Sequence, residues 1–164
     1  MIIMNILHTF SKDYLDDILV HLAHHSAGIE GNTISLPATV SIFVNGTLPT
    51  NGKATVRDFY EIENHKQAFD NILTHLFNED SLTIDIIKEI HADLTDRLQY
   101  DSGKFKKNEN MILGAEFQTA ALMIQLVDNL EYRLESAKTD EEKLIAILDT
   151  HIQFELSDGN GAWF

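Results

Sequence analysis

The chain has no cysteine, and among its 164 residues it has only two prolines and one tryptophan. The lack of cysteine excludes disulfide bonds and thiolate metal sites, and it fits a reducing compartment. No stretch approaches the roughly 18 consecutive apolar residues of a membrane span. The opening MIIMNILHTF has neither the basic segment nor the cleavage site of a signal peptide. We therefore expect a cytoplasmic protein without a membrane partner.

Basic residues are also scarce, since 12 Lys and Arg stand against 26 Asp and Glu, which gives a net charge of −14. The field of such a chain repels phosphates, so we expect no nucleic-acid partner. Any nucleotide site would need a metal ion or oriented N–H groups to offset that repulsion. The apolar content of 44% is typical of globular proteins, and the length fits one domain over residues 1–164.

Apolar residues recur at helical spacing along most of the chain, which predicts an all-α fold. Ser11 is expected to cap the first helix and Ser81 a later one. Glu30-Gly31-Asn32 and Asn45-Gly46 are expected stops, because glycine tolerates the left-handed backbone that follows a last turn. The other expected helices cover residues 35–45, 56–77, 119–137 and 140–156.

The spacing also predicts which side chains face the core. In the first helix these are Leu15, Ile18, Leu22 and Ala23. In the long helix over residues 56–77 they are Phe59, Ile62, Phe69, Ile72 and Leu73, and in the helix after Ser81 they are Ile84, Ile87, Ile90 and Leu94. In the last helix they are Leu144, Ile147, Leu148 and Ile152.

The stretch SGKFKKNENMILGAEF interrupts the helical pattern, because Asn and Gly residues surround a short apolar run, Met111-Ile112-Leu113. This predicts a small β-hairpin or extended flap at about residues 104–118. The free edge of a hairpin can pair with an extended peptide from another protein. A purely structural hairpin is the alternative, and the pattern does not decide between them.

Near the end of the chain, Asp158-Gly159-Asn160-Gly161 combines a carboxylate with two glycines. The acid could hold a divalent cation, and the glycines let backbone N–H groups approach an anion. The alternative is a helix end followed by a surface turn, because Asp-Gly and Asn-Gly are common turn dipeptides. A calcium loop would require a downstream Glu, which is absent.

Other polar residues have a functional and a structural interpretation. Ser26 and Glu30 in SAGIEGN lie one helical turn apart, so Glu30 could point into a neighbouring cationic site or into solvent. His21 and His25 have a spacing that can bind zinc, although no third ligand is evident. His151 could be a general base by its type, or a packed histidine in the last helix.

Taken in order, SAGIEGN, GKFKKNENMILGAEF, HIQFEL and SDGNG resemble the Fic (filamentation-induced-by-cAMP) family of protein adenylyltransferases. They resemble the branch with an inhibitory helix before the core, whose pattern is [Ser/Thr]-x-x-x-Glu-[Gly/Asn]. Ser26, Glu30 and Gly31 match that pattern. The resemblance covers the chain from about residue 11. It assigns about 11–32 to the inhibitory region, 104–118 to the flap and 140–164 to the core helix with a partial motif.

The resemblance implies transfer of AMP from ATP to a Ser, Thr or Tyr hydroxyl of a target protein, with Mg²⁺. It makes Asp158 the metal ligand and Gly159, Asn160 and Gly161 the nucleotide-binding loop. It gives Glu30 the inhibitory role and leaves a homo-oligomer open as a route for relieving inhibition. The flap residues that would align the target are Lys107, Asn108, Glu109, Asn110, Met111, Ile112, Leu113 and Gly114.

The chain departs from the family signature H-P-F-x-[D/E]-G-N-G-R-x-x-R. HIQFEL runs directly into SDGNG, so the motif His is missing, and Ala162 stands at the first Arg position. His151 matches a histidine of the upstream helix and not the motif base. This leaves no catalytic residue to assign and predicts an inactive chain as it stands. The alternatives are a Fic-like module that binds a nucleotide or a partner protein, and an enzyme from which this sequence lacks motif residues.

Overall fold

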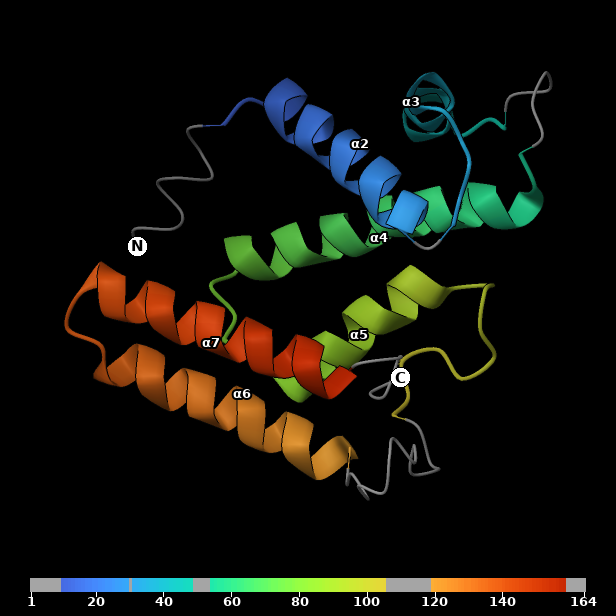
Figure 1. Cartoon of the computed structure of the whole chain (residues 1–164). Helices are drawn as coiled ribbons and strands as arrows, with labels where there is room; N and C mark the ends of the chain where they lie inside the picture. The colour runs from blue at the N-terminus through green and yellow to red at the C-terminus, as the bar shows by residue number, and fades with distance from the viewer. Residues whose placement is uncertain (1–9, 30, 49–53, 106–118, 159–164) are drawn as a thin grey trace. The chain divides into compact units, whose positions relative to one another are not determined.

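The structure is a computed structural model that describes residues 10–29, 31–48, 54–105 and 119–158. Throughout these ranges the regular structure is helical, which confirms the expected all-α fold (Figure 1). The helices are α2 (Lys12–Ile29), α3 (Leu36–Asn45), α4 (Val56–Phe77), α5 (Ile84–Thr95), α6 (Thr119–Ser136) and α7 (Asp140–Asp158). None of them combines the length and the apolarity needed to cross a membrane. The expected flap lies outside the described residues.

The helix ends follow the local signals. Ser11 Oγ accepts a hydrogen bond from the Tyr14 N–H at 3.2 Å, which confirms Ser11 as the cap of α2. The α3 helix ends at Gly46, whose φ of 62° is left-handed as expected. The cap predicted at Ser81 is wrong, because Thr83 Oγ1 accepts from the Ile86 N–H at 3.2 Å and α5 begins only at Ile84. Both residue types cap helices well, so spacing alone could not choose between them.

Contacts divide the chain into two compact units, and the division passes through α5. The first unit contains residues 1–81 and 90–102, and the second contains residues 82–89 and 103–164. The single domain expected over residues 1–164 stays a prediction.

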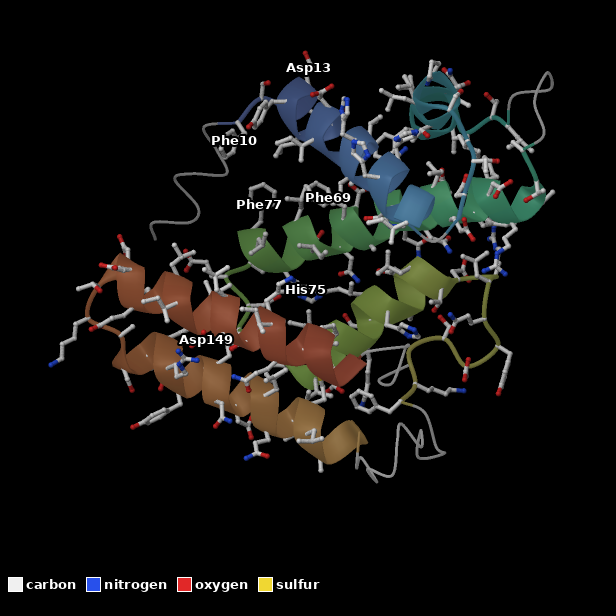
Figure 2. All side chains as sticks on the ribbon, viewed as in Figure 1. Phe10, Asp13, Phe69, His75, Phe77 and Asp149 are labelled. Carbon is white, nitrogen blue, oxygen red and sulfur yellow. The ribbon has the colours of Figure 1, made fainter. Side chains whose placement is uncertain are left out.

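In the first unit, α2, α3 and α4 pack against one another. Their core contains Ala23, Ala27, Ile34, Ile42 and Ile62, and all five are buried. A second cluster of Leu19, Val20 and Phe43 packs against Phe69, which projects from α4 toward α2 (Figure 2). The small alanines of α2 let its backbone approach the neighbouring helices, so α2 is held along much of its length.

The inward face predicted for α2 is partly wrong. Ala23 is buried as expected, but Ile18 and Leu22 are exposed, whereas Leu19, Val20 and Ala27 are buried. The buried stripe is therefore rotated around the helix, because α2 must meet both α3 and α4. For α4, the prediction of Ile62 is confirmed, and Phe59 and Phe69 are partly buried and pack against the core clusters as expected. Ile72 and Leu73 are also partly buried.

In the second unit, α6 and α7 pack side by side (Figure 1). Met123 and Val127 of α6 and Ala146 of α7 are buried. The stripe predicted to face inward on α7 is not buried, since Ile147 and Leu148 are 49% and 50% exposed and Leu144 and Ile152 are similarly open. Packing against α6 uses the face of α7 that carries the small Ala146, which turns the larger aliphatic side chains outward.

Candidate functional site

The segment that matches the inhibitory pattern lies at the end of α2. The Asn32 N–H donates to the Ala27 carbonyl at 2.9 Å, and the Gly31 N–H donates to the Gly28 carbonyl at 3.1 Å. This pair of bonds is the Schellman arrangement, which satisfies carbonyls left open by the last turn. Gly31 has a φ of +92°, a left-handed backbone that side chains other than glycine rarely adopt. The stop predicted at Gly31 is confirmed.

Ser26, which begins the candidate pattern, lies in the last turns of α2 and is half-buried. Its chain neighbour Ala27 is buried in the core of the first unit. The backbone at Ser26 is therefore held by the packing of the next residue. Glu30, the acid of the pattern, lies outside the described residues.

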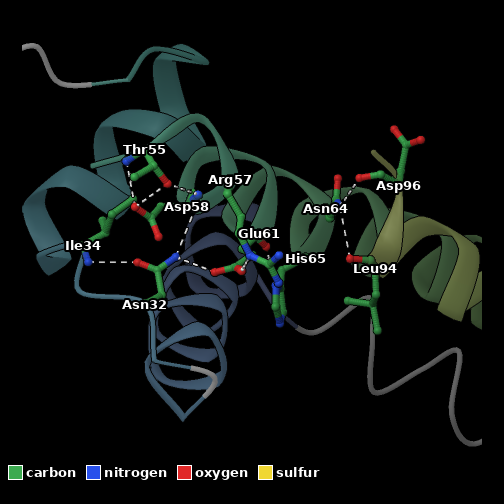
Figure 3. Close-up of polar contacts among 10 residues, drawn as sticks. All are labelled: Asn32, Ile34, Thr55, Arg57, Asp58, Glu61, Asn64, His65, Leu94 and Asp96. Carbon is green, nitrogen blue, oxygen red and sulfur yellow. Dashed lines mark hydrogen bonds and ion pairs between the residues drawn. The ribbon is translucent and has the colours of Figure 1, made fainter. Parts of the chain in front are cut away.

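Asn32, expected only as part of the helix stop, also connects the end of α2 to α4 (Figure 3). Its Nδ2 group donates to the Asp58 carbonyl at 3.3 Å and to Glu61 Oε2 at 2.9 Å. Its Oδ1 accepts from the Ile34 N–H at 2.9 Å, which closes an Asx turn. One side chain thus fixes both the exit from α2 and its distance from α4.

The α4 side of this network is itself ordered by local bonds. Thr55 and Asp58 form a capping box, in which the Asp58 N–H donates to Thr55 Oγ1 at 3.1 Å and the Thr55 N–H donates to Asp58 Oδ2 at 2.7 Å. Arg57 Nε donates to Glu61 Oε1 at 2.9 Å, so each oxygen of Glu61 has its own donor. The carboxylate that receives Asn32 is therefore also held by a neighbouring side chain of α4.

Asn64 is a buried polar residue further along α4. Its Nδ2 group donates to the Leu94 carbonyl at 3.0 Å and to the Asp96 carbonyl at 2.8 Å (Figure 3). These carbonyls lie at the end of α5, where the helix leaves acceptors unpaired. Asn64 therefore acts as a cap supplied from a different helix, which no local sequence signal could have revealed.

The structure describes only some of the remaining residues that match the Fic pattern. Asp158 is the last residue of α7, and its side chain is not described. The glycine loop at residues 159–161 and the flap residues 107–114 lie outside the described residues. The structure therefore describes the end of α2 and the helix that leads to Asp158, each within its own unit.

The three histidines singled out from the sequence are exposed on their helices. His21 and His25 lie on the surface of α2, and His151 is exposed on α7, which disfavours a packed histidine there. In the described part of the chain, no group of three or more His, Asp or Glu side chains could hold a metal ion.

A hollow of about 380 Å³ lies where α6 leads into α7, lined in part by Tyr132, Arg133, Lys138 and Glu142. The side chains of Arg133 and Glu142 already have structural partners. Arg133 Nη2 donates to Asp149 Oδ2 at 2.8 Å, and Glu142 Oε2 accepts from the Lys138 N–H at 2.6 Å. Asp149 is labelled on α7 in Figure 2. This hollow is therefore a weaker candidate than the end of α2.

No protein-family model matches this chain, and no curated protein matches it either.

Proposed function

We propose that this chain is a Fic-type protein adenylyltransferase domain in which α2 is the inhibitory helix and ATP with Mg²⁺ is the ligand. The observation that carries the proposal is the fixed end of α2. A helix that blocks a site must present its acid at a constant place. The left-handed Gly31 and the bonds from Asn32 to α4 fix the backbone that directly follows the proposed inhibitory acid, Glu30, in the sequence.

The position of Asp158 supports the metal role. Mg²⁺ is commonly held by one or two carboxylates together with substrate phosphates, so a three-ligand protein cluster is not needed. Asp158 ends α7, where the helix dipole is negative and an acid is unfavourable. A bound cation would relieve that repulsion and would bring positive charge to the ATP phosphates. The glycines that follow would offer backbone N–H groups to the same phosphates.

The proposal also predicts low activity of the chain as it stands. In the family mechanism, general base catalysis contributes about 10²–10⁴ in rate. One oriented donor to a developing anion contributes about 10²–10³. With neither the motif His nor an arginine at Ala162, we expect no measurable turnover from this chain.

The binding part of the proposal is tested by melting the chain with and without Mg-ATP. A ligand that binds only the folded state raises the melting temperature. We expect a rise with Mg-ATP that is lost in Asp158→Asn. Asp140→Asn, at the opposite end of α7, serves as the matched control and should keep the rise. No rise in the unaltered chain would overturn nucleotide binding.

The catalytic part is tested by restoring the motif. The variant carries Ile-His-Pro-Phe between Leu156 and Ser157, Ala162→Arg, an added arginine after Phe164, and Glu30→Gly. We expect it to label itself or an added protein with AMP from ATP labelled on the α-phosphate. The control replaces the inserted His by Ala. Equal label in both chains would overturn the adenylyltransferase assignment.

A second function is favoured by the interrupted motif itself. HIQFEL runs into SDGNG without a base, and Ala162 replaces an arginine, which fits a Fic-like module that binds a nucleotide or a partner without catalysis. This alternative predicts the same rise in melting temperature with Mg-ATP as the first proposal. It is distinguished by the restored chain, which would still bind Mg-ATP and would transfer no label.

A further inference from the structure

Outside the proposed nucleotide site, the outer surface of α2 carries a row of metal-binding residue types. Asp17, His21 and His25 follow one another at intervals of four residues, so they lie on one face in successive turns. All three are exposed, and the His21 side chain is 48% accessible. The apolar contacts of α2 use other positions, so neither histidine is needed for the core of the first unit.

The hydrogen bonding of His21 leaves one ring nitrogen available. Its Nδ1 atom lies 2.9 Å from the Asp17 carbonyl oxygen. A carbonyl can only accept, so Nδ1 carries the proton and Nε2 of the neutral ring keeps its lone pair. Metal-binding histidines usually have this arrangement, in which the second nitrogen donates to a carbonyl or carboxylate.

The two rings are close enough to share an ion. The ring centroids of His21 and His25 are 6.4 Å apart with an angle of 35° between the planes. A metal bound to a ring nitrogen at about 2.0–2.1 Å lies roughly 3 Å from the ring centre. Two rings at this separation therefore need only small side-chain rotations, and exposed rotamers change freely.

We propose that His21 and His25 form a two-histidine surface site for a divalent transition-metal ion, with water in the remaining coordination positions. The charged and titratable groups nearest the pair are Asp17, whose Oδ1 is 3.6 Å from His21 Nδ1, and His24, whose ring centroid is 5.3 Å from that of His25. Since the described residues contain no cluster of three possible ligands, the site has two protein ligands and exchanges its ion readily.

The ligand set predicts which ions bind. Imidazole nitrogen suits Zn²⁺, Ni²⁺ and Cu²⁺, whereas Mg²⁺ and Ca²⁺ prefer oxygen ligands. The surface pair thus differs in chemistry from the Mg²⁺ site proposed at Asp158, and it lies on a different helix. The inference does not depend on the proposed function.

The test is calorimetric titration of the full chain with NiCl₂ alone, repeated with ZnCl₂ and with MgCl₂. We expect saturable binding of Ni²⁺ and Zn²⁺ that is lost in His21→Asn and also in His25→Asn. His65→Asn is the matched control, because His65 Nδ1 donates to the Glu61 carbonyl at 2.6 Å but has no histidine one turn away. That variant and His24→Asn should keep the binding, and circular dichroism checks that every variant is helical.

Several results would overturn the pair. These are no saturable Ni²⁺ binding in the unaltered chain, binding that survives either single replacement within the pair, and Mg²⁺ binding that is lost in His21→Asn or His25→Asn. Loss of binding in His24→Asn or His65→Asn would place the ion elsewhere and would also overturn the assignment. None of these results affects the expected rise in melting temperature with Mg-ATP. The histidine site and the proposed function can therefore fail separately.

Discussion

The helices α4 and α7 are similar in length and begin in the same way, yet they bury very different amounts of apolar surface. They have 22 and 19 residues, and each starts with a capping box. In α7 the Glu142 N–H donates to Thr139 Oγ1 at 3.1 Å and the Thr139 N–H donates to Glu142 Oε2 at 3.3 Å. However, Ile62 of α4 is 1% exposed, whereas Ile147 and Leu148 of α7 are about half exposed.

The difference comes from the neighbours of each helix. Within its unit, α4 packs against both α2 and α3, while α7 packs against α6. Helices α2 and α3 meet α4, and Asn64 of α4 also bonds the end of α5. On α7, a stripe centred on Ala146 meets α6. Helix formation thus follows local capping in both cases, and burial is decided by what the helix meets.

The largest expected effect comes from truncating one isoleucine in each helix. Ile62→Ala should lower the free energy of unfolding of the first unit by about 2–5 kcal/mol, because it removes buried methyl groups and leaves a cavity. Ile147→Ala should cost less than about 1 kcal/mol, because half of the side chain already contacts water. Chemical denaturation followed by circular dichroism measures both.

If the two isoleucine variants lost equal stability, the apolar stripe of α7 would have to be covered in solution. That result would break the comparison. Leu148→Ala, at a neighbouring and similarly exposed position, would show whether the cover extends along the stripe.

Removing the amide of Asn64 is expected to have the next largest effect. Asn64→Ala leaves the carbonyls of Leu94 and Asp96 without their donor, and an unpaired buried polar group costs about 1–3 kcal/mol. Asn129→Ala on α6 removes an exposed amide and should change the free energy of unfolding by less than about 0.5 kcal/mol. Hydrogen exchange at the end of α5 should rise only in the first variant. Unchanged exchange there would show that Asn64 is not its cap.

The capping boxes at the first turns of α4 and α7 test the feature that the two helices share. Thr55→Ala and Thr139→Ala each remove a side-chain acceptor from the first turn of a long helix, and each should cost about 1 kcal/mol. We expect similar losses of stability in the two variants, because the contribution of a helix cap is local and does not depend on what the helix packs against. Thermal melts compare them, with Thr55→Ser and Thr139→Ser as controls that keep the acceptor. A large loss in one helix alone would mean that its cap also makes a tertiary contact.

The smallest effect is expected for the ion pair that joins α6 to α7. The distance from Arg133 Nη2 to Asp149 Oδ2 is 2.8 Å, and the two side chains are 37% and 48% accessible. Exposed pairs of this kind contribute about 0.2–1 kcal/mol and weaken with salt. A double-mutant cycle with Arg133→Ala and Asp149→Ala should give a coupling in this range that falls at high salt. A coupling of zero would leave apolar packing as the main attachment of α7.

The fold class and most helix ends could be predicted from the sequence because they depend on neighbouring residues. Ser11, Gly31 and Gly46 act through backbone groups a few positions away. The capping boxes at Thr55 and Thr139 have the same local character, although they were not predicted. The outward turn of Ile147 and Leu148 was not readable, because periodicity marks an apolar stripe without naming a partner.

In the candidate site too, local features were predicted and long-range contacts were not. The left-handed stop at Gly31 was predicted from its own residue type. Asn32 and Asn64 were not predicted, because their partners lie 26 to 32 positions along the chain. An asparagine carries no local mark of which distant helix it will reach, so its role becomes evident only when that helix is in place.

The bonds of Asn32 set a limit on chain length. Asn32 is tied to α4 on one side and to Ala27 on the other, so the number of residues between Ser26 and Asn32 cannot change freely. One residue inserted into α2 rotates everything beyond it by about 100° and advances it by about 1.5 Å. Substitutions at exposed positions of this stretch other than the left-handed Gly31 should be tolerated, whereas insertions and deletions should not.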